Sequence, residues 1–183
     1  MTLRVVRIYG DPALRQKAAP VTEFDDTLRR LVEDMRETMA AYHGIGLAAN
    51  QVGVLQRVLV VDVPLDDETR ARYALVNPTI IERSGSESNE EGCLSIPGIY
   101  EDVTRSFGLT VRAFDEHGKE FELRAEGYLA RAIQHEVDHL DGVLFIDRLS
   151  PLKRQFLRHA LESLARGDMP EGYRPPVAPG GPG

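Results

Sequence analysis

Cysteine is nearly absent from this 183-residue chain, whose one example is Cys93. A single cysteine excludes an intramolecular disulfide framework, and the segment from Met1 to Arg4 lacks the long apolar run of a secretory signal. Long hydrophobic runs are missing elsewhere too, because polar and charged residues interrupt even the apolar stretch 55–63, and a membrane helix needs about 20 apolar residues. We therefore expect a cytoplasmic protein with no membrane insertion.

Positive charge is also in short supply. The formal net charge is -7 and the pI is near 5.3. Because binding to nucleic acid needs a basic surface, these values argue against a protein whose main function is nucleic-acid binding. No specific DNA binding is expected. With 42% hydrophobic residues, the chain is long enough for one well-filled core. We predict a single catalytic domain over residues 1–167 and a flexible tail rich in proline and glycine over residues 168–183.

The remaining sequence alternates helix and strand signals. Apolar periodicity and end signals predict three helices, over 25–43, over 127–141 with Gly142 after it, and from Ser150-Pro151 to about 166 with Gly167 as its stop. In the last helix we expect a buried stripe made of Leu152, Phe156, Ala160, Leu161 and Leu164. Strands are predicted over 57–63, 73–82, 107–115 and 119–124, the last two as a hairpin, and the glycine-rich stretch 44–53 is predicted to be a shaped loop.

The most informative stretch is 134–139, which reads Gln-His-Glu-Val-Asp-His. On a helix, His135 and His139 lie about 40° apart, on one face, and can bind one metal ion. Glu136 projects at the edge of that face, close enough to address a metal-bound water. The alternative is a buried helix whose histidines only satisfy backbone groups. The fold we predict is α+β, with antiparallel or mixed sheets around this central metal-binding helix, an N-terminal amphipathic helix and a C-terminal helix.

A catalytic site of this type needs a third protein ligand. A third histidine in the metzincin arrangement is excluded because residue 145 is Phe145, and Glu162 is expected to face solvent. Cys93 is the remaining candidate, although a lone cysteine is commonly an inert buried thiol. Two rival functions stay open: a metallopeptidase that uses Glu162 or another acid as its third ligand, and a binding protein with a closed structural metal site.

Three segments together, 44–53, 91–95 and 134–139, resemble the signature motifs of peptide deformylase in order and approximate spacing. The resemblance implies a metal-dependent hydrolase that removes the formyl group from the N-terminal formyl-methionine of nascent polypeptides. It implies that Cys93, His135 and His139 hold one divalent ion, Fe²⁺ in the cell, for which Zn²⁺, Ni²⁺ or Co²⁺ can substitute. It also implies the roles of three catalytic groups: Glu136 as general base and acid, and the side-chain amide of Gln51 and backbone N–H of Leu94 as oxyanion donors.

Residues near the ligand pair are candidates for the methionine pocket. On the helical wheel Tyr128, Arg131 and Ala132 share the ligand face, and we add Ile45 and Gly46 from the glycine-rich stretch. Arg131 fits an apolar pocket only if its aliphatic stem lines the wall while its charged head reaches solvent.

Three readings remain open at this point. Considered without the motif, Gln51 is an ordinary loop amide. Glu91 is a partner of the metal ligands, a substrate-facing carboxylate or a solvated acid. The last helix carries basic residues that the resemblance links to docking on the ribosome surface, although four charges are also typical of a solubilising face. These are Lys153, Arg154, Arg158 and Arg166.

Overall fold

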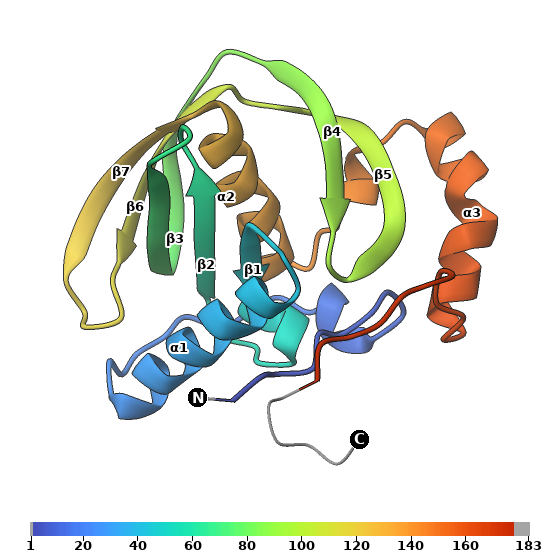
Figure 1. Ribbon diagram of the computed structural model, residues 1–183. Helices are drawn as coiled ribbons and strands as arrows, with labels where there is room; N and C mark the ends of the chain where they lie inside the picture. Colours follow the sequence, from blue (N-terminus) through green and yellow to red (C-terminus); the bar gives the residue numbers. More distant parts are fainter. Residues whose placement is uncertain (1, 178–183) are drawn as a thin grey trace.

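The computed structural model describes residues 2–177, in which two antiparallel sheets and three α-helices make a mixed α+β fold (Figure 1). The helices are α1 Asp26–Ala41, α2 Gly127–Leu140 and α3 Pro151–Ala165. The strands are β1 Gly46–Ala48, β2 Val58–Pro64, β3 Arg70–Ser84, β4 Glu87–Cys93, β5 Ile96–Arg105, β6 Gly108–Phe114 and β7 Glu120–Glu126. Short 3₁₀ helices cover Pro12–Arg15, Ala49–Val52 and Phe145–Arg148.

The larger sheet has the strand order β1-β2-β3-β6-β7, with every pair antiparallel. Strand β2 is apolar at every position from Val58 to Val61, so both faces of the sheet are buried there. Leu59 and Val61 pack in the cluster that contains α2 residues, whereas Val58 and Val60 pack in the cluster that contains α1 residues. Alternation along one strand thus places one helix on each face of the sheet.

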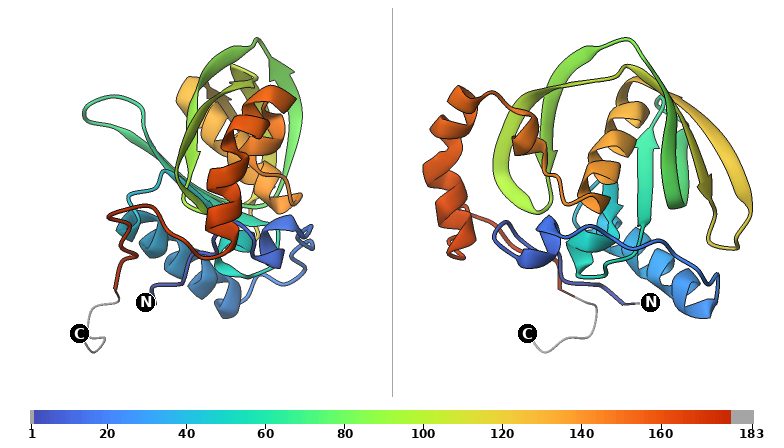
Figure 2. Two further views of the ribbon diagram at one scale, coloured as in Figure 1. Left: turned by 90° about the vertical axis from the view of Figure 1, so that its right-hand side faces the viewer. Right: turned by 180° about the vertical axis from the view of Figure 1, so that it is seen from behind.

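Strands β4 and β5 form a separate two-stranded sheet. Helix α2 lies between this hairpin and the larger sheet, and α3 lies outside the hairpin (Figures 1 and 2). A third cluster joins β5 to α3 through Ile96, Leu161 and Leu164. The sequence did not predict this hairpin, because segment 87–93 reads Glu-Ser-Asn-Glu-Glu-Gly-Cys and has neither apolar alternation nor β-branched residues.

Local signals explain where the helices begin and end. The Asp25 side chain accepts a hydrogen bond from the Leu28 N–H at 3.0 Å, and Ser150 caps α3 in the same way at 3.2 Å. Gly142 and Gly167 follow α2 and α3 with φ of +73° and +91°, the left-handed conformation that glycine adopts without strain. The three predicted helices and the β6–β7 hairpin are confirmed to within a few residues.

Two local predictions were wrong. The stretch 44–53 is not a loop throughout, because β1 and a 3₁₀ helix occupy Gly46–Val52. The buried stripe of α3 was also misplaced: Leu152 and Phe156 are 63% and 80% exposed, and Ala160 is exposed too. Only Leu161 and Leu164 of that stripe are buried. The helix therefore buries a narrower face than its apolar content suggested.

No α-helix within residues 2–177 is both long and apolar enough to cross a bilayer.

Candidate metal centre and active site

Three potential ligand atoms converge at the face of α2 that meets β4. The Nε2 atoms of His135 and His139 are 3.2 Å apart, and the Cys93 Sγ lies 3.3 Å from the His139 Nε2. All three ligand atoms lie within 4.8 Å of one another. The two histidines come from one helix, as their spacing predicted, whereas Cys93 ends β4 and is brought to them by the hairpin.

These separations fit one metal ion. Tetrahedral ligands at Zn–N and Zn–S distances are about 3.3 to 3.6 Å from one another. The observed 3.2 and 3.3 Å separations are near that range. Burial lowers the pKa of His139, and the proximity of His135 lowers it further, which favours a neutral imidazole at that residue. Burial by itself would also lower the pKa of His135, but its hydrogen bonds to Cys93 and Glu91 outweigh burial and raise the pKa instead. One thiolate and two imidazoles suit zinc, iron, cobalt or nickel.

Glu91 orients the His135 ring from behind. Its Oε1 lies 2.8 Å from the His135 Nδ1, so the ring donates from Nδ1 and turns its other nitrogen toward Cys93 and His139. The His135 ring also stacks on the ring of Phe145, with the two centroids 6.1 Å apart. Phe145 therefore packs against a ligand at the sequence position where a metzincin would have its third histidine.

Glu91 is itself held by two buried arginines. Arg105 donates to both of its carboxylate oxygens at 2.9 Å, and Arg131 donates to Oε2 at 2.7 Å. Burial by itself would raise the pKa of Glu91, but the bonds from His135 and Arg105 outweigh it and hold the pKa at about 2. Of the readings the sequence left open, the structure supports the one in which Glu91 is the partner of His135, one of the three candidate ligands. Arg105 had no sequence signal, since it lies in none of the motifs.

The prediction for the head of Arg131 was wrong. Arg131 is only 4% exposed, and its guanidinium donates to Glu91 and to the carbonyl oxygens of Val103 and Glu87 at 2.7 and 2.8 Å. The head turns inward because four acceptors on the β4–β5 hairpin surround it, which a helical wheel cannot reveal. Arg131 still lines the cavity described below.

The other polar residues of segment 134–139 hold α2 in place. The Gln134 side chain donates to the Ser106 carbonyl at 2.9 Å and accepts from its N–H at 3.1 Å. Asp138 accepts from Arg105 at 2.6 Å and from Arg148 at 2.7 Å. Gln134 thus ties α2 to Ser106, directly after β5, and Asp138 ties it to the last residue of β5 and to the 3₁₀ helix after α2.

Glu136 is 4% exposed and lies against Gly46. A Cβ added at Gly46 would come 2.5 Å from the Glu136 Oε1, so only glycine allows β1 to approach this carboxylate so closely. Burial raises the pKa of Glu136 to about 7. Within residues 2–177 its Oε2 is one of three buried side-chain atoms that have no hydrogen-bond partner.

Gln51 and Leu94 lie beside the sulfur of Cys93. The Gln51 Nε2 is 3.6 Å from the Cys93 Sγ and donates to the Ser95 Oγ at 3.1 Å, while its Oε1 accepts from the Ala48 N–H at 2.9 Å. Its side-chain amide is therefore fixed with the N–H end toward the ligand cluster. Leu94 occupies the β4–β5 turn directly after Cys93, and its side chain contacts Gly44.

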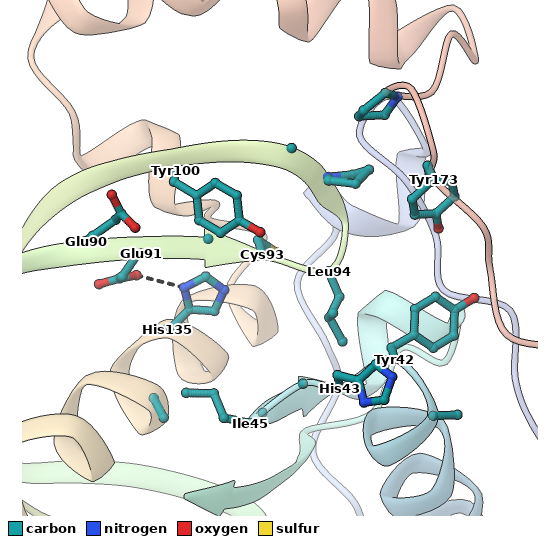
Figure 3. A pocket seen from close by; sticks show the side chains of 18 of the residues that line it. Tyr42, His43, Ile45, Glu90, Glu91, Cys93, Leu94, Tyr100, His135 and Tyr173 are labelled. Carbon is teal, nitrogen blue, oxygen red and sulfur yellow. Dashed lines mark hydrogen bonds and ion pairs between the residues drawn. The ribbon is translucent and has the colours of Figure 1, made fainter.

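The ligand cluster opens into a cavity of about 820 Å³. Cys93 and His135 line it, as do all five residues predicted for the methionine pocket: Ile45, Gly46, Tyr128, Arg131 and Ala132. In Figure 3 His135 and Cys93 mark the end of the cavity at the candidate ligand cluster, and Tyr42, His43 and Tyr173 gather at the opposite end. The five pocket residues are thus brought together next to the ligands.

Part of the cavity wall comes from a segment to which the sequence gave no role at the site. Residues 170–174 and 176 line it, all from the stretch predicted to be a flexible tail. Residues 178–183 of that tail lie outside the described part of the chain. Tyr100, which packs its ring against Gly92, was also not predicted to line the site.

Glu162, the alternative third ligand, is not near this cluster. It lies on α3 and accepts from Arg158 at 2.8 Å on the exposed face of the helix. The three-residue group of Cys93, His135 and His139 does not include it.

Comparison with known proteins agrees with this geometry. A family profile described as polypeptide deformylase matches residues 3–155. The peptide deformylase of Alkalilimnicola ehrlichii is 51% identical over 166 residues, which cover 91% of this chain and 93% of the relative. That of Xylella fastidiosa (strain M12) is 50% identical over 169 residues, covering 91% and 98%.

Solved structures give the same result. The peptide deformylase of Thermus thermophilus superposes with a TM-score of 0.84 at 44% identity and covers 91% of this chain and 99% of that one. The enzyme of Ehrlichia chaffeensis in complex with actinonin has a TM-score of 0.85 at 38% identity, covering 92% and 99%.

Proposed function

The chain belongs to the polypeptide deformylase family, and from that premise we propose that Cys93, His135 and His139 bind the catalytic metal of an enzyme that removes the N-formyl group from nascent peptides. The observation that carries the proposal is the approach of one sulfur and two imidazole nitrogens within 4.8 Å, on the wall of a cavity large enough for a peptide end. We propose Fe²⁺ as the ion in the cell, with Zn²⁺, Ni²⁺ or Co²⁺ as substitutes. In this proposal α2 is the metal-binding helix around which the two sheets are arranged.

When bound, the divalent ion supplies Lewis acidity that activates water and polarises the formyl carbonyl. The side chains do the rest. Glu136 accepts the proton of the attacking water and passes it to the departing amine. The side-chain N–H of Gln51 and the backbone N–H of Leu94 donate to the oxyanion that develops on the formyl oxygen. The fixed orientation of the Gln51 amide supports its role, because a preorganised donor loses no free energy to reorientation during the reaction.

The methionine side chain is proposed to occupy the pocket formed by Ile45, Gly46, Tyr128, Arg131 and Ala132. Arg131 contributes its stem to the wall while its head is neutralised by Glu91, so no unpaired charge faces the thioether. We further propose that residues 1–167 form the single catalytic domain and that the enzyme works in the cytoplasm, where nascent chains are made.

Formate release from formyl-Met-Ala-Ser tests the proposal directly. The protein loaded anaerobically with Fe²⁺ or Ni²⁺ is expected to release formate, and removal of the metal by a chelator is expected to stop the reaction. Metal analysis of anaerobically purified protein identifies the native ion. Absence of formate from either loaded form would contradict the proposal.

The same substrate separates the rival functions. A metallopeptidase would release free amino acids or shorter peptides instead of formate, and mass spectrometry of the products distinguishes the two. Cys93→Ser sharpens the test, because only a site with a thiolate ligand loses its soft donor in this variant. A binding protein with a closed structural metal site would contain bound metal but would release neither formate nor peptide fragments.

Docking on the ribosome surface through α3 is a second, separate proposal. Leu152 and Phe156 are exposed on one side of α3 and Arg154 is exposed on the opposite side, so the helix offers both apolar and basic surface to a ribosome. Three of the four basic residues are paired, Lys153 with Glu101, Arg158 with Glu162 and Arg166 with Asp168, which favours the solubilising alternative instead. Cosedimentation with ribosomes decides the matter: docking predicts a salt-sensitive association that Phe156→Ser and Arg154→Glu weaken.

A further inference from the structure

The segment that follows α3 turns back toward the catalytic cavity. The Gly167 N–H donates to the Leu164 carbonyl at 2.9 Å and the Asp168 N–H to the Ser163 carbonyl at 3.0 Å, with Gly167 in the left-handed region. This capping arrangement ends the helix and reverses the chain. The direction of residues 168–177 is therefore set by hydrogen bonds at the end of the helix.

Two packing contacts then hold the returning segment against the β4–β5 hairpin. Met169 packs on the core cluster that contains Ile96 and Leu161. Pro170 lies directly over Gly98, since a Cβ added at Gly98 would be 2.9 Å from the Pro170 Cγ. Gly98 follows the turn that carries Cys93 and Leu94, so the segment is attached to the element that supplies the third metal ligand.

A tight turn next places an aromatic ring at the cavity. The Tyr173 N–H donates to the Pro170 carbonyl at 3.0 Å, and Gly172 between them has a φ of +79°, as the third position of a type II turn requires. Tyr173 is half-buried and lies on the same side of the cavity as Tyr42 (Figure 3). Burial raises the pKa of the Tyr173 hydroxyl, which agrees with a ring that is partly removed from water.

The result is a cavity with two different ends. Residues 170–174 and 176 line the end away from His135, and they include a ring, a cation and two prolines. A peptide bound with its formyl group at the metal must extend away from the ligands, and an extended chain advances about 3.3 Å per residue. The residues after formyl-methionine would therefore run toward this wall.

We propose that residues 170–176 form the outer wall of the peptide groove and bind the part of the substrate that follows the formyl-methionine. Tyr173 packs against the side chains of that part, and the Arg174 guanidinium donates to its main-chain carbonyl groups. Residues 170–176 take no part in the chemistry, so they determine how well longer peptides bind and leave the reaction of the shortest ones unchanged. This inference rests on the proposed use of the cavity as the substrate site.

The test compares substrates of increasing length on full-length protein. For Tyr173→Ala combined with Arg174→Ala, KM for a formyl-Met peptide of four or five residues is expected to rise about threefold to tenfold, as loss of an aromatic and an arginine contact gives. The kcat for every peptide, and the KM for formyl-Met-Ala, are expected to stay within about twofold of wild type, because the wall lies outside the reach of a dipeptide.

Val177→Ala is the matched control. Val177 belongs to the same segment and is 75% exposed, and it is not among the residues that line the cavity. This variant should show wild-type kinetics at every peptide length. A second variant, cut after Met169, keeps the Met169 packing contact and should reproduce the length dependence of the double variant.

A KM that changes equally at all lengths, or at none, would overturn the inference. An equal rise in KM at all peptide lengths would mean that the segment only supports the fold. The same variants would then also unfold at a lower temperature. Failure of the proposed function is a distinguishable result, since wild-type protein would then release no formate from any of the peptides.

Discussion

The two ends of the cavity are built in different ways. At the end next to the proposed ligands Cys93 and His135, called the metal end below, Glu91 is 6% exposed and receives hydrogen bonds from Arg105, Arg131 and His135. Buried charges therefore fix these side chains. At the outer end, Tyr173 is positioned by a glycine turn and by packing of the segment that precedes it. The first end depends on charge compensation, the second on backbone geometry.

This difference matches what each end has to do. Metal ligands need an orientation that tolerates little error, and hydrogen-bonded partners behind the ligands supply it. A surface that meets many different nascent chains needs only to exclude water and to offer rings and a cation. We therefore expect substitutions at the metal end to affect chemistry and stability, and substitutions at the outer end to affect binding of longer peptides alone.

The largest effect is expected from His135→Asn. It removes one of the three proposed ligands, so bound metal should be lost and formate release should fall by more than about a thousandfold. Metal content and formate assays measure both. His43→Asn is the counterpart at the outer end, where asparagine tolerates the left-handed φ of +56°, and it should retain the metal. Full metal content in the His135 variant would contradict the proposal that His135 is a metal ligand, and with it the comparison of the two ends of the cavity.

The next effect is expected from Glu136→Gln. Loss of the proposed general base should lower kcat on the order of a hundredfold to a thousandfold while metal content and KM change little. Steady-state kinetics with formyl-Met-Ala-Ser provide the measurement. Glu120→Gln, on exposed β7, is the control and should behave as wild type. If kcat of the Glu136 variant stays within a fewfold of wild type, another group must move the proton.

A smaller effect on activity, with a large effect on stability, is expected from Glu91→Gln. The change removes the carboxylate that pairs with the buried guanidinium of Arg131 and leaves Arg105 with Asp138, which should cost about 3 to 5 kcal/mol of unfolding free energy. Metal affinity should fall about tenfold to a hundredfold because the His135 ring loses its anchor. Urea denaturation and competition with a chelator measure the two quantities. An unchanged free energy of unfolding would mean that the ion pairs of Glu91 with Arg105 and Arg131 do not stabilise the fold.

The smallest effect is expected from Glu162→Gln. This residue also accepts from an arginine, Arg158, but the pair is exposed on α3 and screened by water. The free energy of unfolding and formate release should both stay at wild-type values. A clear loss of stability would contradict the distinction between buried and exposed ion pairs on which the preceding prediction depends.

How much of the fold the sequence predicted depended on how local the signal was. Helix α3 was located by the Ser150 cap, the proline after it and Gly167, all within the helix or next to it. The β4–β5 hairpin was missed because β4 is polar and is a strand only through its pairing with β5. Leu152 and Phe156 were wrongly predicted to be buried for a related reason. An apolar stripe on a helix does not reveal how much of it another element covers.

At the site the same division holds. The sequence by itself determined that His135 and His139 share a face, because four residues make just over one helical turn whatever surrounds the helix. Only the tertiary structure decided that Cys93 approaches them, that Glu91 rather than solvent receives the head of Arg131, and that residues 170–174 and 176 line the far end of the cavity. Those contacts join residues 40 or more positions apart, and such contacts follow from strand pairing and side-chain packing, which no local sequence pattern encodes.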